Sequence, residues 1–301
     1  MSISTVKAVI NGATYTLTLN SSTGKYEGQI TAPSVSSWNN NGKYFPVVIT
    51  ATDTAGNSTT VNDSHATLGN SLKLTVKEIT PPVITITAPT EGQRTTNSKP
   101  TVTFTVTDND SGVDQDTIKI TIDSTVITTG ITKTPVTNGF QCSYTPGTAL
   151  SDGTHTIRAD AKDNDGNSAI QRTVSLIVDT VPPTLSVSAP VNNLITNKTS
   201  VTVVGTTNDT TSSPCTVTVK LNSGTATTVT VAGDGSFSKA LTLANGSNTI
   251  TVVSTDTAGK STTISRTVIL DVDAPIISKV EILPNPVNVG NVYTIAVTVM
   301  D

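Results

Sequence analysis

The chain has 301 residues, of which 13% are charged and 3% aromatic, and its formal net charge is −4 at pH 7. This weak negative charge offers no basic surface for nucleic acid, and no apolar stretch is long enough to span a membrane. Thr, Val, Ser, Ile and Asn dominate, and apolar residues do not recur at helical spacing. The composition therefore predicts an all-β protein of two or three domains.

The first segment, residues 1–79, begins with a strand pattern. Val6, Ala8 and Ile10 alternate with polar residues, as do the residues from 47 to 51. Such period-two alternation indicates strands with one buried face.

Between these two strands lies the chain's main aromatic cluster. Trp38 stands in a polar loop over residues 34–43, and Tyr44 and Phe45 follow it. Aromatic faces stack on sugars and are enriched at binding hot spots, which makes Trp38 and Tyr44 candidate contacts for a host-surface glycan or receptor. The alternative is that Tyr44 and Phe45 cap the core and leave Trp38 half-buried.

A turn signature, and a proline signature that follows it, recur at intervals of roughly 100 residues, the size of one immunoglobulin-type sandwich. The turn signatures are Asp53-Thr-Ala-Gly-Asn57, Asp163-Asn-Asp-Gly-Asn167 and Asp256-Thr-Ala-Gly-Lys260. The proline signatures are Glu78-Ile-Thr-Pro-Pro82, Asp179-Thr-Val-Pro-Pro183 and Asp271-Val-Asp-Ala-Pro275. They divide the chain into predicted segments 1–79, 80–179, 180–272 and 273–301. In the second segment we expect the first strand over Val83–Ala88 and the last over Ser168–Val178.

These motifs resemble the repeating pattern of bacterial Ig-like (Big-type) domain arrays, which occur in surface adhesins and in bacteriophage tail or other virion proteins. The resemblance implies tandem immunoglobulin-like β-sandwiches. Because proline fixes φ before each first strand, we expect them to form an extended rod. Lys260 stands where the pattern has Asn, which puts the side-chain hydrogen bonding of that turn in doubt but not its fold.

The two ends of the chain look like halves of one sandwich. Residues 1–79 open at the third strand, and residues 273–301 supply the first two strands of a further sandwich. In that final segment Ile276–Leu283 matches a first strand, and Ile295, Val297 and Val299 match a second. We therefore predict incomplete sandwiches at both termini that complete one another head to tail between copies. The predicted interface residues are Val6, Ala8, Ile10, Ile276, Ile295, Val297 and Val299. The alternative is a boundary that cuts a longer array.

Acidic residues are predicted to gather at the end of each sandwich where its first strand begins. The three groups are Glu78, Asp108, Asp110 and Asp163; Asp179, Asp209 and Asp256; and Asp271, Asp273 and Asp301, which would meet Asp53 of a second copy. Grouped carboxylates suit Ca²⁺, which takes six to eight oxygen ligands. The alternative is that these residues serve only the tight turns that hold them.

The sequence carries no recognisable catalytic pattern. Its two histidines, His65 and His155, are not accompanied by a glycine-rich phosphate loop, a zinc motif or a triad arrangement. Cys142 and Cys215 alternate with apolar residues, which predicts buried thiols rather than reactive ones. We therefore expect a non-enzymatic protein.

The favoured function is a structural component of a bacteriophage virion, such as a tail, fibre or decoration protein, that acts as a multi-domain spacer. The absence of an export signal or wall anchor in this chain favours the virion over the bacterial surface. The expected partners are other copies of the chain, other virion or surface proteins and a host-surface receptor. The alternatives are a bacterial cell-surface adhesin or fibre stalk, and the accessory domains of a carbohydrate-active or lytic enzyme.

Overall fold

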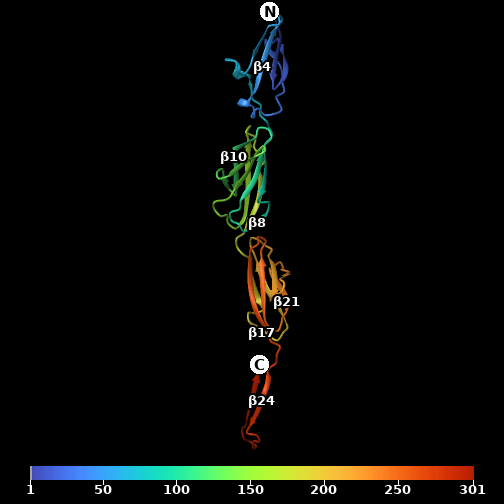
Figure 1. Ribbon diagram of the computed structural model, residues 1–301, viewed down its shortest axis with the longest axis vertical. Helices are drawn as coiled ribbons and strands as arrows, with labels where there is room; N and C mark the ends of the chain where they lie inside the picture. The colour runs from blue at the N-terminus through green and yellow to red at the C-terminus, as the bar shows by residue number, and fades with distance from the viewer. Residues whose placement is uncertain (1) are drawn as a thin grey trace. The chain divides into compact units, whose positions relative to one another are not determined.

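The computed structural model describes residues 2–301, which form β-strands with two short 3-10 helices, η1 (Asn41–Lys43) and η2 (Gly69–Leu72). The all-β prediction is confirmed (Figure 1). Contacts between residues divide the chain into two compact units, one built from residues up to 93 with 97–178 and the other from 94–96 with 179–301. The division falls next to the predicted boundary at residue 179, although residues 94–96 of the predicted segment 80–179 are grouped with the second unit. No helical segment within residues 2–301 has the length and apolar character needed to cross a bilayer.

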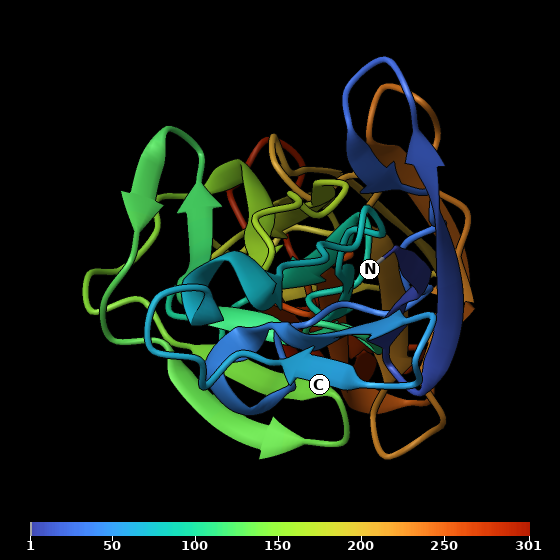
Figure 2. The ribbon, with the colours of Figure 1, turned by 90° about the horizontal axis from the view of Figure 1, so that it is seen from above.

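The first segment forms a single sheet, drawn in blue in Figures 1 and 2. Its strand order is β3-β2-β1-β4-β5, and β6 pairs with β4. The strands are β1 (Ile3–Ile10), β2 (Ala13–Asn20), β3 (Lys25–Glu27), β4 (Phe45–Asp53), β5 (Ser58–Val61) and β6 (Lys73–Leu74). Among the described residues of this segment, no second sheet faces the first.

The second segment is a complete sandwich of two sheets. One sheet has the order β12-β13-β9-β7, from β7 (Val83–Ala88), β9 (Val102–Thr107), β12 (Thr132–Val136) and β13 (Gly139–Tyr144). The other has the order β11-β10-β14-β15-β8, from β8 (Gln93–Thr95), β10 (Val113–Ile122), β11 (Thr125–Ile127), β14 (Gly153–Asp163) and β15 (Arg172–Val178). Phe104, Ile120 and Ile157 are fully buried between them, as alternation along each strand requires.

The predicted first strand of this sandwich coincides with β7, whereas the predicted last strand begins too early. Ser168 makes only an isolated bridge to Lys162, and the continuous ladder starts at Arg172. Ala169 still turns inward while Ile170 points into solvent, so the chain leaves the regular ladder directly after the Asp-Gly turn.

The third segment repeats the sandwich. One sheet has the order β16-β18-β21, from β16 (Thr184–Ala189), β18 (Ser200–Asn208) and β21 (Ser236–Thr242). The other has the order β17-β23-β22-β19-β20, from β17 (Leu194–Thr196), β19 (Thr216–Leu221), β20 (Thr227–Val229), β22 (Gly246–Thr255) and β23 (Ser261–Leu270). Val203, Val217 and Ile250 are fully buried in its core. Each sandwich holds one buried free cysteine, Cys142 in the second segment and Cys215 in the third.

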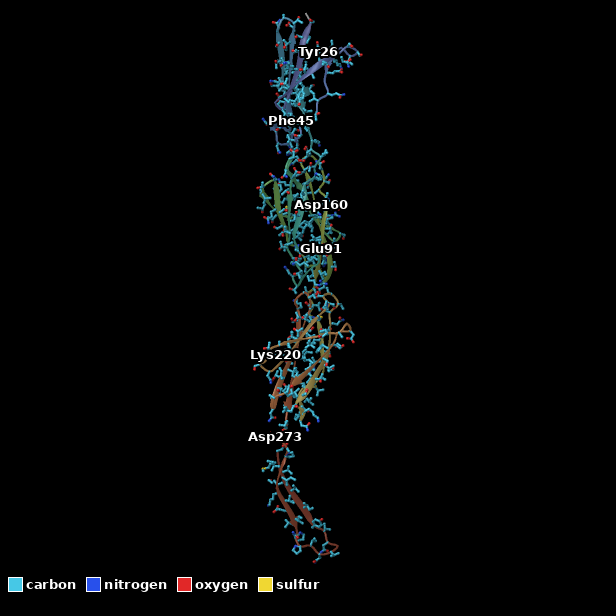
Figure 3. All side chains as sticks on the ribbon, turned by 90° about the vertical axis from the view of Figure 1, so that its right-hand side faces the viewer. Tyr26, Phe45, Glu91, Asp160, Lys220 and Asp273 are labelled. Carbon is cyan, nitrogen blue, oxygen red and sulfur yellow. The ribbon has the colours of Figure 1, made fainter. Side chains whose placement is uncertain are left out.

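The last segment is a two-stranded hairpin of β24 (Ile276–Leu283) and β25 (Thr294–Met300), drawn in red in Figure 1. Every residue of both strands is exposed. Its side chains can be followed in Figure 3 beyond the labelled Asp273.

Candidate functional site

The hairpin β24–β25 has the strand register that opens a complete sandwich. In each case the residue after the proline signature pairs with the last residue of the second strand. The three pairs are Val83 with Thr107, Thr184 with Asn208, and Ile276 with Met300. Each ladder also contains one register shift along its first strand. The hairpin therefore has the pairing register of the first two strands of the complete sandwiches.

The hairpin differs from the first two strands of the complete sandwiches in the burial of its apolar side chains. In the second segment Ile84, Phe104 and Val106 are 2%, 0% and 0% exposed. The residues at the same register positions in the hairpin are Ile277, Val297 and Val299, which are 64%, 49% and 53% exposed. Apolar strands with this exposure are surfaces that proteins ordinarily cover.

In the first sheet, the inward side chains of β4 are more exposed than those of β1. Val47, Ile49 and Ala51 of β4 are only half-buried. The matching residues of the complete sandwiches, which lie on β14 and β22, are buried: Ile157, Ala159, Ala161, Ile250, Val252 and Ser254.

The predicted interface residues Val6, Ala8 and Ile10 of β1 are instead already buried within the chain. The open surface is thus centred on β4.

The first acidic group brings together Glu78, Asp108 and Asp163, which each offer one carboxylate oxygen within 4.8 Å of the others. Backbone and side-chain donors hold these groups. Ser111 N donates to Glu78 at 2.7 Å, and the Asn167 amide donates to Asp163 Oδ2 at 2.7 Å. Burial, together with the nearby Asp108 charge, raises the pKa of Glu78. This group is therefore largely satisfied by the chain itself.

Asp110 does not belong to this group, although the sequence placed it there. Both of its carboxylate oxygens accept hydrogen bonds from Ser36 N, at 3.0 and 2.9 Å. The loop of the first segment thus takes up the side chain that we expected to face the acidic cluster.

The second acidic group, Asp179, Asp209 and Asp256, is more deeply buried, with exposures of 0%, 8% and 6%. One carboxylate oxygen from each again lies within 4.8 Å of the others. In all three residues Oδ1 accepts backbone N–H groups of the following turn. Oδ2 of Asp179 and of Asp256 is buried without any hydrogen-bond partner in the protein.

The remaining predicted metal residues lie apart from these two groups. Asp53 accepts hydrogen bonds from Ala55 N and from both nitrogens of Asn57. Asp271, Asp273 and Asp301 are exposed, and Asp271 accepts a hydrogen bond from Asp273 N.

Comparison with known families bears on both complete sandwiches. Residues 82–159 match the family described as a bacterial Ig domain, and residues 183–272 match domain B of glucodextranase. The chain contains tandem Ig-like domains, the first of which matches the bacterial Ig family. The predicted family resemblance and the sandwich fold are thereby confirmed.

A curated relative matches part of the Ig-like array. The chain is 31% identical over 136 residues to Bacillopeptidase F of Bacillus subtilis (strain 168), which covers 45% of this chain and 9% of that protein. The chain therefore spans less than a tenth of the length of that relative.

Similar solved structures are also modular. The fibronectin(III)-like modules of Clostridium thermocellum CbhA are 18% identical and cover 62% of this chain and 94% of their own, with a TM-score of 0.36. Immunoglobulin domains 1–5 of Sidekick-1 are 15% identical and cover 88% of this chain and 51% of theirs, with a TM-score of 0.35. Immunoglobulin-like and fibronectin-like domains are typically non-catalytic.

The aromatic cluster lies in the loop that leads into β4, where Figure 3 labels Phe45. The Lys43 ammonium stands 3.2 Å from the centroid of the Trp38 ring, so one face of the indole carries a cation–π contact. The Tyr44 hydroxyl donates to Asp63 at 2.7 Å, and Phe45 is buried. These side chains are thus engaged within the first segment.

Two residues outside the predicted set matter to these sites. Asp165 accepts hydrogen bonds from Ser36 Oγ at 2.6 Å and from Glu78 N at 3.0 Å, which ties the loop of the first segment to the second sandwich. Its signal in the sequence is that the other two turn signatures carry Ala at this position. The second residue is Lys260, which replaces the Asn of the other turns.

Proposed function

We propose that this chain is a non-enzymatic structural spacer that assembles head to tail by strand complementation. In this assembly the hairpin β24–β25 of one copy covers the open face of the β1–β6 sheet of the next copy. The observation that carries the proposal is the hairpin's register, which is that of the first two strands of a sandwich, while its apolar side chains lie in solvent.

The physical basis is the burial of apolar side chains between two sheets. In the complete second sandwich β7 and β9 belong to the sheet opposite β10 and β14, and alternating side chains fix which face of each strand is buried. Val297 and Val299 of the hairpin would supply the apolar layer that Val47, Ile49 and Ala51 lack. A docked hairpin would bury more than the ~1,000 Å² that a specific interface needs.

The setting that we propose is outside the cell, with the bacteriophage virion first and a bacterial surface fibre second. A contact that joins one end of a molecule to the other end of its neighbour is heterologous, so it gives open fibres, or rings where the rotation closes. Either product suits a repeated component of a tail, fibre or decoration.

The test is the mass of the purified chain, by light scattering after size exclusion, as a function of concentration. We expect the mass to rise with concentration, and Val297→Lys to remain monomeric because a lysine would be buried in the completed core. Thr298→Lys is the matched control, since this neighbouring side chain points to the opposite face of the strand. Negative-stain microscopy of the assembled sample would distinguish fibres from rings.

A wild-type chain that stays monomeric at every concentration would rule the assembly out, as would a Val297→Lys chain that assembles normally. The monomeric result would leave a second candidate, an accessory array within a longer enzyme. That candidate is favoured by the matches to glucodextranase domain B and to Bacillopeptidase F.

A further inference from the structure

The three copies of the Asp-x-x-Gly turn differ in whether the second carboxylate oxygen, Oδ2, of the leading aspartate accepts a hydrogen bond. In the first, Asn57 Nδ2 donates to Asp53 Oδ2 at 3.0 Å, and in the second, Asn167 Nδ2 donates to Asp163 Oδ2 at 2.7 Å.

In the third copy, Lys260 donates only its backbone N–H, to Asp256 Oδ1 at 2.9 Å. Asp256 Oδ2 is left buried without a hydrogen-bond partner in the protein. The change from Asn to Lys therefore frees one carboxylate oxygen.

The freed oxygen belongs to the buried group Asp179, Asp209 and Asp256, in which Asp179 Oδ2 also lacks a partner. A buried carboxylate is strongly unfavourable unless it is paired with a cation, hydrogen-bonded or bound to a metal ion. Within residues 2–301, no Lys, Arg or His side-chain nitrogen forms a salt bridge, within 4.0 Å, to any of these three carboxylates. Three acidic groups thus share a buried space without a protein counter-charge.

The spacing of the three oxygens fits one ion. Calcium binds oxygens at about 2.3–2.6 Å, so two ligands on opposite sides of it stand roughly 4.6–5.2 Å apart. The three carboxylate oxygens lie within 4.8 Å of one another, inside that limit. The Ser212 hydroxyl oxygen, in the loop whose backbone N–H binds Asp209 Oδ1, is likewise buried without a partner and could supply a neutral ligand.

We propose that Asp179, Asp209 and Asp256 bind one Ca²⁺ ion in the third Ig-like domain, and that Lys260 keeps an oxygen of Asp256 available for it. The Glu78, Asp108 and Asp163 group differs because the Asn167 amide already occupies the matching oxygen.

Calcium titration of the chelator-treated full-length chain by calorimetry, with melting in calcium and in EDTA at matched ionic strength, tests this site. We expect one bound ion and a calcium-dependent rise in melting temperature. Asp209→Asn should abolish both, yet melt at or above the wild-type temperature in EDTA, because it removes one of three mutually repelling charges. An Asp209→Asn chain that melts at or above the wild-type temperature in EDTA is folded, so its loss of calcium binding would not result from misfolding.

Lys260→Asn is the decisive variant. Its amide should occupy Asp256 Oδ2 and weaken calcium binding by about tenfold or more, since hydrogen bonds to charged groups are worth at least that much. Asp163→Asn, in the other acidic group, is the matched control and should leave the affinity unchanged. The proposal fails if calcium and EDTA give the same wild-type melting temperature, if Asp163→Asn rather than Asp209→Asn abolishes binding, or if Lys260→Asn binds as tightly as wild type.

Discussion

At the scale of single residues, the histidine of the second sandwich is a buried group whose two ring nitrogens both face hydrogen-bond acceptors. His155 is buried, with Nδ1 2.9 Å from Asp123 Oδ2 and Nε2 2.8 Å from the carbonyl oxygen of Ser151. Burial opposes its protonation, but the hydrogen bonds to Ser151 and Asp123, with the Asp123 charge, raise the pKa of His155 above its ordinary value. Both ring nitrogens face acceptors, which favours the imidazolium.

This pair makes the stability of the second sandwich depend on pH. Because the pKa of His155 is raised in the folded state, its contribution to the free energy of unfolding is complete below the unfolded pKa of 6.5. That contribution is lost as the pH rises through the folded pKa. Although burial opposes it, the His155 hydrogen bond lowers the pKa of Asp123 below 3.8, so that contribution is present above 3.8 and lost as pH falls. Both contributions to the stability of the second sandwich are therefore complete between pH 3.8 and pH 6.5.

Asp123→Asn should lower the melting temperature of the second sandwich most near about pH 5 and least near about pH 9. Asparagine keeps an oxygen for Thr156 N and tolerates the positive φ of 53° at this position, so the variant should fold. Thermal melts across this range measure the effect. A loss of equal size at every pH would contradict the charged pair.

At the scale of elements, the same strand stands in complete and incomplete surroundings within one chain. Ile157 of β14 is fully buried between two sheets, whereas its match in β4, Val47, and the next inward residue, Ile49, are half-buried in a single sheet. Both strands precede an Asp-Gly turn and have the same alternation. The difference in side-chain burial between β14 and β4 shows how much a second, facing sheet buries.

Ile157→Ala should therefore destabilise the second sandwich by about 2–5 kcal/mol, the usual cost of a large cavity in a closed core. Ile49→Ala should cost clearly less in the isolated chain, because water already reaches that face. Urea unfolding of the two variants at low protein concentration gives the comparison. Equal losses would mean that the first sheet is already closed.

Strand alternation made much of the fold predictable, because a period of two dictates which side chains face inward. It placed β7 and β24 at their observed bounds. It could not place Asp110, whose partner Ser36 lies 74 residues earlier and belongs to a loop without periodicity. The lost side-chain hydrogen bond at Asp256 was indicated by Lys260, but the burial of the freed oxygen depends on tertiary packing that a strand pattern does not show.

At the scale of the whole molecule, the two complete sandwiches have separate cores. The core around Phe104 and Ile157 shares no residue with the core around Val203 and Ile250. Each core is closed by its own pair of sheets. Stability is therefore expected to be a property of each sandwich rather than of the chain.

Thermal unfolding followed by calorimetry should accordingly show more than one transition, since two-state behaviour holds for single domains and not for arrays of them. Val203→Ala, in the core of the third sandwich, should lower the temperature of one transition and leave the other in place. A single transition that moves as a whole would instead indicate that the two sandwiches unfold together.

The buried cysteines give this array a built-in chemical readout. Burial raises the pKa of Cys142 to about 11, so its thiolate is scarce and hidden at neutral pH, and Cys215 occupies the third sandwich alone. An alkylating reagent can therefore modify Cys142 only when the second sandwich opens, whereas Cys215 is 8% exposed and lines a surface pocket with Pro214 and Val229. Mass spectrometry of the labelled Cys142 peptide would time the opening of the second sandwich in the unmodified chain, and the Cys215 peptide would serve as the comparison.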